Sequence, residues 1–232
     1  NAFYKRLNFK TLIHESKKTI EKKTVNLEFK PITLNDAKTC REVLSQYKKL
    51  TPTPSFAFDT ETDSIVSQRA NLVGFSFCFV KNAAYYVPLK HKEGLNLAMK
   101  DFDEIFAPFL QDKNYPKIAQ NAKYDINVLG RHGIEVCGLK DDTLIASYLT
   151  NPEGTHNLDA LSLKYLNHDT IKFSDLVKKG ETFADVPIEK ATVYAAEDAW
   201  VTLQILDLLK SELKDFGLID VYQNIEVPLL AV

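Results

Sequence analysis

The stretch Phe56-Ala-Phe-Asp59-Thr-Glu61 decides how the rest of the chain is interpreted. The run Ser55–Asp59 is typical of a short, largely buried strand. Side chains two positions apart on a strand point to the same face, so Asp59 and Glu61 would lie roughly 6–7 Å apart on one side. Two carboxylates at the end of a buried strand repel each other, and a proton or a divalent cation must offset that repulsion.

This pair alone does not separate a metal site from the capping and turn roles that such carboxylates also play. A calcium loop of the EF-hand kind starting at Asp59 is excluded. That loop needs a glycine at its sixth position and a bidentate glutamate at its twelfth. Ser64 and Ala70 stand at those positions.

A second acidic position lies in Ala119-Gln-Asn-Ala-Lys-Tyr-Asp125. The segment follows a predicted strand, 117–120, and opens a predicted helix, 123–132, which puts Asp125 in the first helical turn. Asn121, four residues earlier, can share a helix face with it. An aspartate in a first turn often only complements the helix dipole, so this position also needs support from elsewhere.

A third group lies in Tyr194-Ala-Ala-Glu-Asp198-Ala199, inside a long predicted C-terminal helix. Aspartate is unfavourable inside a helix by about 0.5 kcal/mol relative to alanine. The surrounding alanines indicate a closely packed surface. Tyr194 and Asp198 are four residues apart, so hydroxyl and carboxylate share one face. Glu197, one position round the helix, is expected to be solvated.

The remaining pattern predicts antiparallel strands followed by alternating strands and helices, hence a mixed sheet with helices on its faces. Bulky and small residues alternate from Asn71 to Val80, and a tight turn at Lys81-Asn82 leads to a second hairpin strand, 83–89. Further helices are expected after a cap at Asn35 or Asp36, as far as Leu50, and at 98–109, 142–149, 157–166 and 188–213.

Composition bounds the class of protein. The 232 residues are 45% hydrophobic and 26% charged, which fits one large domain or one domain with appendages. No apolar run approaches the ~18 residues of a membrane span. Three isolated cysteines make no CxxC pair, so we expect reduced core thiols in a cytoplasmic protein. Residues 1–30 carry a net charge of +5 and the remainder −7, so any phosphate ligand of the acidic body would require bound cations.

The chain combines three motifs in this order: acid-x-acid on a strand, a later aspartate, and Tyr-x-x-x-Asp. This combination resembles that of the four-carboxylate 3′–5′ exonucleases, in their tyrosine-bearing branch. Between about Pro31 and Phe216 the chain resembles the proofreading domain of bacterial family A DNA polymerases, the DNA polymerase I family. That resemblance implies an α/β, ribonuclease H-like fold, with a mixed five-stranded sheet flanked by helices. The segments that carry it are FAFDTETDS, ANLVGFSF, AQNAKYD, DTLIASYL, LDALSLKYL and YAAEDA.

The resemblance also implies the roles of the site residues. Asp59 would bridge two divalent cations, Mg²⁺ or Mn²⁺, with Glu61 and Asp198 completing the first ion's ligands. Asp125 would hold the second ion through water. Tyr194, with Glu61, would orient the attacking water, and the product would be a nucleoside 5′-monophosphate. Oxygen ligands suit these cations better than zinc.

Contacts to a single-stranded DNA 3′ end are implied as well. Ile65 matches an apolar wedge between the last two bases, and Phe173 an aromatic that packs near the terminal nucleotides. The positions implied to touch the sugar–phosphate strand are Gln120, Asn121 and Tyr124. Two residues depart from the family pattern: Trp200 replaces a common aspartate and is expected to face away from the metals, and Thr155 replaces an arginine of some relatives.

The flanks suggest a piece of a longer polymerase. Residues 1–30 resemble a basic linker at the end of a preceding 5′-nuclease region, 31–216 the 3′–5′ exonuclease domain, and 217–232 the start of a polymerase domain. These neighbouring domains would be its partners, in a monomeric cytoplasmic bacterial protein without a membrane segment. Two alternatives stay open: an RNA-trimming enzyme of the ribonuclease D kind, and a non-catalytic spacer that supports the polymerase.

Overall fold

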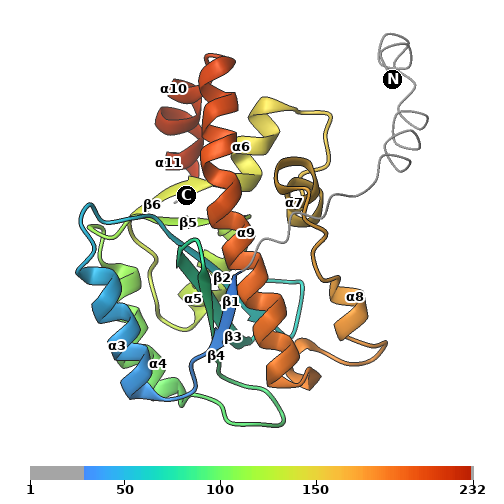
Figure 1. Ribbon diagram of the computed structural model, residues 1–232. Helices are drawn as coiled ribbons and strands as arrows, with labels where there is room; N and C mark the ends of the chain where they lie inside the picture. Colours follow the sequence, from blue (N-terminus) through green and yellow to red (C-terminus); the bar gives the residue numbers. More distant parts are fainter. Residues whose placement is uncertain (1–28, 231–232) are drawn as a thin grey trace.

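A mixed six-stranded sheet with helices on both faces forms the body of the computed structural model, which describes residues 29–230 (Figure 1). The strands follow the order β1-β4-β3-β2-β5-β6 across the sheet. Antiparallel pairing joins β3 to both β4 and β2, whereas the outer pairs β1–β4, β2–β5 and β5–β6 are parallel. The strand bounds are β1 Lys30–Thr33, β2 Phe56–Thr62, β3 Leu72–Val80, β4 Ala83–Pro88, β5 Lys117–Ala119 and β6 Leu139–Asp142.

Alternation along the central strands gives the sheet one bulky face and one small face. The bulky face carries a stack of phenylalanines that packs against α3 (Ala37–Lys48), α4 (Met99–Gln111) and α5 (Ala122–Arg131). These phenylalanines are Phe56 and Phe58 of β2 and Phe75, Phe77 and Phe79 of β3, all buried. The predicted contrast between the two faces of the 71–80 strand is therefore confirmed.

The small face of the sheet is covered by α9 (Ile188–Asp215), a helix of 28 residues. It contacts the strands β1, β4, β3, β2 and β5, and α6 (Thr143–Thr150) and α7 (Leu158–Leu166) pack beside it. The side chains that α9 buries there are mostly small, which lets the helix approach the sheet closely. They include Ala191, Ala195, Ala196 and Ala199.

Shorter elements complete the chain. Between α7 and α9 lie α8 (Phe173–Leu176) and the turn η1 (Phe183–Asp185), and after α9 come α10 (Ile219–Val221), η2 (Tyr222–Glu226) and α11 (Val227–Leu229). Tyr222 is fully buried, and its hydroxyl accepts a hydrogen bond of 2.8 Å from the N–H of Asp142. Residues beyond Phe216 thus pack onto the same body as the sheet.

The expectation of five strands is wrong, because the sheet has six. The sequence analysis named neither edge strand, β1 or β6. β1 contains Pro31 and begins at Lys30, inside the segment assigned to a linker; the rest of that assignment lies outside the described residues. β6 has the sequence Leu-Lys-Asp-Asp. An edge strand pairs on one side only and tolerates proline and charge, so neither segment shows the alternation by which strands are recognised.

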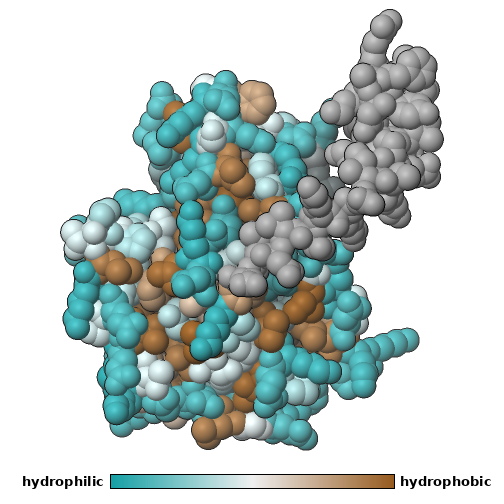
Figure 2. All heavy atoms as spheres, in the orientation of Figure 1, coloured by the Kyte–Doolittle hydropathy of each residue, from teal (hydrophilic) through white to brown (hydrophobic). Residues whose placement is uncertain are grey.

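Hydrophilic residues cover most of the face in Figure 2, with apolar residues in small separate groups among them. Such scattered groups are ordinary on a protein surface. Within residues 29–230, no helix combines the length and the apolar character needed to cross a bilayer.

Gly74 on β3 gives a direct test of the small face. A Cβ at this position would lie 2.0 Å from the Tyr86 hydroxyl and within 2.5 Å of its ring. We expect Gly74→Ala to lower the free energy of unfolding by ~1–3 kcal/mol through overpacking, measured by urea denaturation. In the control Gly130→Ala, a Cβ on α5 meets nothing within 4 Å, and we expect a gain of ~0.5–1 kcal/mol. Equal stability of the two variants would contradict the packing described here.

Candidate active site

The outer end of β2 presents its acids to α9. Ala57 belongs to the α9 side of the core, and strand alternation places Asp59 and Glu61 on the same side. Their partners across β3 are small: Asp59 pairs with Ser76 and Glu61 with Gly74. The Tyr86 side chain occupies the space beside Gly74, so the small residues of β3 make room for this ring next to the acids.

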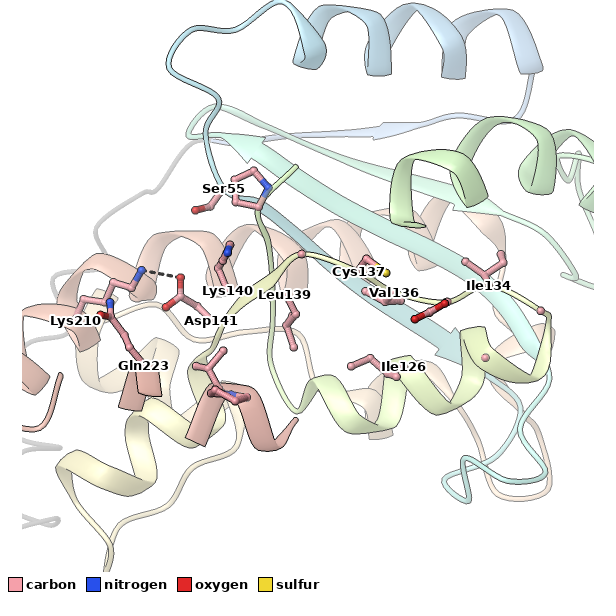
Figure 3. Close-up of a pocket in the computed structure, with 17 residues that line it drawn as sticks. Ser55, Ile126, Ile134, Val136, Cys137, Leu139, Lys140, Asp141, Lys210 and Gln223 are labelled. Carbon is pink, nitrogen blue, oxygen red and sulfur yellow. Dashed lines mark hydrogen bonds and ion pairs between the residues drawn. The ribbon is translucent and has the colours of Figure 1, made fainter. Parts of the chain in front are cut away.

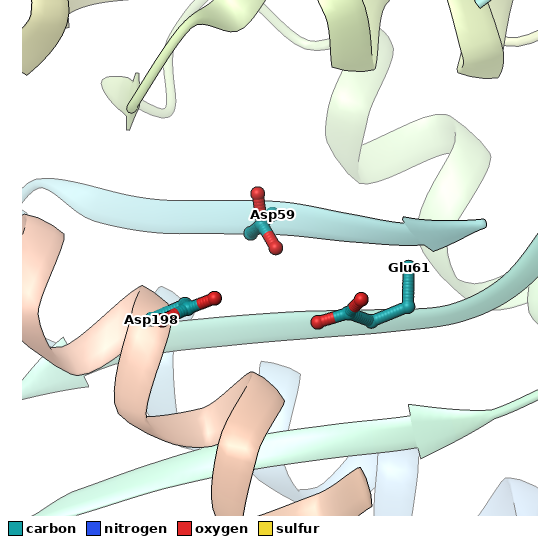
Figure 4. A group of neighbouring side chains, drawn as sticks. All are labelled: Asp59, Glu61 and Asp198. Carbon is teal, nitrogen blue, oxygen red and sulfur yellow. The ribbon is translucent and has the colours of Figure 1, made fainter. Parts of the chain in front are cut away.

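Asp198 reaches the same place from α9. One carboxylate oxygen from each of Asp59, Glu61 and Asp198 can be chosen so that all three lie within 4.8 Å of one another (Figure 4). Residues 59 and 198 are 139 positions apart, so tertiary structure alone brings these groups together. We call these three residues the acidic cluster.

Burial sets the electrostatics of the cluster. Glu61 is only 7% exposed, and its Oε1 has no hydrogen-bond partner among the described residues. Burial raises the pKa of Asp59 to about 7. Burial first, and then the charge of Asp59, raise the pKa of both Glu61 and Asp198 well above the ordinary range. Three carboxylates in this position must bind protons or a cation.

The donor set fits a hard divalent cation. All the available ligand atoms are carboxylate oxygens, which Mg²⁺ and Mn²⁺ prefer, and the cluster contains neither histidine nor cysteine. The buried, unpaired Oε1 of Glu61 is the kind of orphaned acceptor that a bound ion satisfies. The acidic cluster can therefore hold such an ion.

Asp125 lies beside the cluster, in the first turn of α5, as the sequence predicted. Its Oδ1 accepts hydrogen bonds from the N–H of Thr60, at 3.0 Å, and from the Thr60 hydroxyl. Burial, followed by the charge of Asp59, raises the pKa of Asp125. It is not one of the three mutually close carboxylates. Asn121 does not share a helix face with it, because Asn121 precedes α5 in a left-handed conformation with φ of 65°.

Tyr194 lies one helical turn before Asp198, and its hydroxyl lowers the pKa of the Asp198 carboxyl against the larger effect of burial. The Tyr194 ring is packed against two aromatic rings, those of Phe173 at 6.3 Å and Phe183 at 5.8 Å between centroids. Burial raises the pKa of Tyr194, so the phenol is neutral. The expected pairing of hydroxyl and carboxylate on one face of the helix is present.

Of the residues predicted to contact DNA, two have exposed side chains and two have side chains that are hydrogen-bonded within the protein. Ile65 is 93% exposed and Phe173 48% exposed, which leaves both available to a ligand. Tyr124 donates its hydroxyl to the backbone carbonyl of Ser64, next to Ile65. Gln120 is held internally: its amide N–H donates to the His156 carbonyl at 2.8 Å and its carbonyl accepts from the Thr143 hydroxyl.

Glu197 corrects one expectation, because it is 5% exposed rather than solvated. Its carboxylate binds His168 and the N–H of Ile171, a pair of contacts that the sequence analysis missed. No local pattern predicts these contacts, because His168 and Ile171 lie 29 and 26 residues earlier in the sequence. Trp200 is itself buried, and its indole N–H donates to the Lys81 carbonyl at 2.7 Å.

A separate groove of about 1080 Å³ lies along α5, β6 and α11 (Figure 3). It contains no member of the acidic cluster. Its one buried carboxylate, Asp141, is neutralised by Lys210 at 2.6 Å.

The mixed sheet with helices on both faces is a ribonuclease H-like fold, and comparison with solved structures agrees. Pol1 of M. smegmatis, in complex with DNA primer-template, gives a TM-score of 0.67 at 19% identity, covering 86% of this chain and 30% of that one. Escherichia coli RNase D gives 0.66 at 17%, covering 88% and 50%. Brucella melitensis NrnC with bound Mg²⁺ gives 0.63 at 20%, covering 88% and 89%.

The particular family follows from sequence. The model of the 3′–5′ exonuclease family found in A-type DNA polymerases matches residues 31–214. DNA polymerase I of Pseudomonas aeruginosa is 42% identical over 195 residues, 80% of this chain and 21% of the relative. That of Rhizobium leguminosarum is 40% identical over 199 residues, 76% and 20%. The chain belongs to this 3′–5′ exonuclease family, and it spans about a fifth of the length of these relatives.

The raised pKa of Asp59 predicts an unusual pH dependence in EDTA. A carboxyl group that stays protonated in the folded state while the unfolded chain has ionised releases a proton on unfolding. The free energy of unfolding therefore falls as pH rises from about 4 towards about 7. We expect Asp59→Asn to reduce this fall and to be more stable than the parent at about pH 8, measured by urea denaturation.

Two controls accompany this measurement. Asp103→Asn removes an exposed carboxylate on α4, far in sequence from the cluster, and should keep the parental pH profile. Mn²⁺ should restore stability to the parent at the higher pH and have less effect on Asp59→Asn. A pH profile of Asp59→Asn that coincides with that of the parent would rule out Asp59 as the source.

Proposed function

We propose that this chain is a metal-dependent 3′–5′ exodeoxyribonuclease, the proofreading module of a protein of the DNA polymerase I type. It would hydrolyse the terminal phosphodiester of single-stranded or frayed DNA 3′ ends and release nucleoside 5′-monophosphates. One observation carries the proposal: the acidic cluster, with three carboxylate oxygens within 4.8 Å of one another and the buried Oε1 of Glu61 unpaired. A merely structural cluster would have no reason to retain that repulsion.

In this proposal Asp59, Glu61 and Asp198 hold one divalent cation, and Asp59 with Asp125, the latter through water, holds a second. Two such ions, when bound, lower the pKa of a water nucleophile and stabilise the charge on the departing 3′ oxygen. Asp125 is ready for its indirect role because one of its oxygens is engaged by Thr60. The cations also explain how an acidic body accepts a phosphate.

Tyr194 and Glu61 orient the attacking water. Burial keeps the Tyr194 phenol neutral by raising its pKa, so the hydroxyl can donate or accept a hydrogen bond without adding charge. Contact with Phe173 and Phe183 restricts the ring. A restrained hydroxyl beside the acidic cluster loses little entropy when it positions a water molecule.

The exposed apolar side chains next to the cluster would bind the end of the strand. Phe173 offers a ring face for a terminal base, a contact worth ~1–3 kcal/mol, and Ile65 would separate the last two bases. Gln120, Asn121 and Tyr124 are proposed for the sugar–phosphate strand. Because both ends of the Gln120 side-chain amide are bonded internally, to His156 and Thr143, Gln120 would contact the strand through its backbone.

The wider setting is also proposed. Residues 31–216 would form the exonuclease domain, with a 5′-nuclease region before it and a polymerase domain starting near 217, in a monomeric, cytoplasmic bacterial protein. Identity of 42% to a DNA polymerase I over 80% of this chain favours DNA over RNA as substrate. The unpaired Glu61 favours catalysis over a spacer role.

The first test is removal of a cluster carboxylate. Asp59→Ala and Asp198→Ala should each abolish Mg²⁺-dependent release of mononucleotides from a single-stranded DNA oligonucleotide, because each removes a cation ligand. Asp207→Ala removes an exposed aspartate from the same helix and should retain parental activity. Mg²⁺-dependent activity in both cluster variants would refute the assignment. Faster degradation of RNA than of DNA of the same sequence would favour the ribonuclease D-like alternative.

Loss of the Tyr194 hydroxyl should have a milder effect. Tyr194→Phe removes one hydrogen bond worth ~1–3 kcal/mol, so the rate constant for cleavage should fall about 10- to 100-fold. Tyr85→Phe is the matched control, because Tyr85 is buried on the opposite face of the sheet, and its cleavage rate should not change. An unaltered rate in Tyr194→Phe would eliminate water positioning by the phenol.

A further inference from the structure

The connection between α7 and α8, residues 167–172, is attached to α9 by Glu197, the residue before Asp198. The Glu197 Oε1 lies 2.7 Å from His168 Nε2, and its Oε2 accepts a 2.7 Å hydrogen bond from the N–H of Ile171. Because a carboxylate only accepts here, the His168 Nε2 carries the proton. One buried carboxylate thus holds the connection at two points.

Further contacts make this connection rigid. The His168 ring lies edge-on to Trp200, with centroids 5.7 Å apart. The Thr170 hydroxyl donates to Asp159 on α7, and Lys172 pairs with the other Asp159 oxygen at 3.1 Å. Of the contacts described in this and the preceding paragraph, two come from α9, the helix that carries Asp198. They are the hydrogen bonds of Glu197 and the ring contact of Trp200.

The connection leads directly to Phe173, the first residue of α8. The side chain of Phe173 is half exposed, and its ring meets Tyr194 edge to face at 6.3 Å. α8 has four residues, of which Leu176 packs partly buried against the core, and the Phe173 ring stacks on that of Phe183 with 6.3 Å between centroids. The segment before Phe173, which Glu197 holds, fixes the point at which α8 begins.

A buried glutamate at position 197 costs stability if its role is only structural. A buried carboxylate loses its hydration, and a well-packed apolar residue would stabilise the fold at least as well. Glu197 also stands directly beside Asp198, where another negative charge opposes ionisation of the cluster. A requirement to fix the 168–173 segment explains why an acid is kept at this position.

We infer that Glu197 is a positioning residue. Through His168 and Ile171 it places Phe173 against Tyr194, and it thereby shapes the binding site of the terminal nucleotide. The inference rests on the proposed function and adds to it a determinant of affinity for the 3′ end. Glu197 acts on binding through Phe173, and on the chemistry of the cluster only indirectly.

The test combines kinetics with a double-mutant cycle, using a single-stranded oligothymidylate as substrate. Glu197→Gln can satisfy Ile171 or His168 as an acceptor but not both. It should raise KM about 5- to 20-fold, within the range of a lost base stack, and leave kcat within about twofold. In a Phe173→Ala background the same change should have almost no effect, because the ring through which it acts is absent.

Two further variants distinguish positioning from folding. His168→Gln retains an N–H donor for Glu197 and should behave like the parent, whereas His168→Ala should resemble Glu197→Gln. Glu212→Gln is the matched control: Glu212 also connects α9 to α7, by Tyr165 at 2.6 Å and Lys164 at 3.3 Å, but 15 residues further along the helix. Its KM should be unchanged.

The outcomes separate this inference from the function on which it rests. If the parent neither cleaves nor binds the oligothymidylate, the proposed function fails, and this inference with it. If the parent cleaves but Glu197→Gln has a parental KM, lowers kcat alone, or has an effect that adds to that of Phe173→Ala, the function stands and the positioning role is refuted. A KM increase in Glu212→Gln as large as in Glu197→Gln would likewise show only a general loosening of α9.

Discussion

The mutual repulsion of carboxylates gathered at the end of β2 is the constraint on which the rest of the structure depends. Asp59, Glu61 and Asp198 are held together although burial opposes the charge on each, and the pKa of every one of them is raised. Keeping such groups close together requires a rigid framework. The sheet and the long helix α9 provide that framework, and both are fixed by cores on either side of the sheet.

The framework works because bulk is distributed unevenly across the sheet. Phenylalanines fill one face, where they bury large apolar areas against α3, α4 and α5. Glycine, serine and alanine line the other, where α9 must come near enough to deliver Asp198. Stability and chemistry are thus assigned to opposite faces of the same strands, and the alternation of side chains along β2 serves both.

Neighbouring side chains on α9 also point in different directions, and one of them contacts the loop 167–172. Glu197 and Asp198 are adjacent, yet one carboxylate is consumed by His168 and Ile171 while the other faces the cluster. The 100° step between successive helix residues sends the two side chains in different directions. Of these two adjacent acids, Glu197 therefore holds the loop and Asp198 contributes to the candidate metal site.

Local sequence determined the alternation of β2 and β3, the placement of Asp125 in a first helical turn, and the shared face of Tyr194 and Asp198, because each depends on residues within a few positions. Family resemblance added the expectation that these acids converge. Only the tertiary structure decided the rest: the sixth strand, the burial of Glu197, and the internal hydrogen bonds of Gln120. Edge strands such as β6 carry no periodic signal of their own, and whether a helical glutamate is solvated depends on a loop nearly thirty residues away. Pairing and burial are properties of neighbours in space, which no short window of sequence contains.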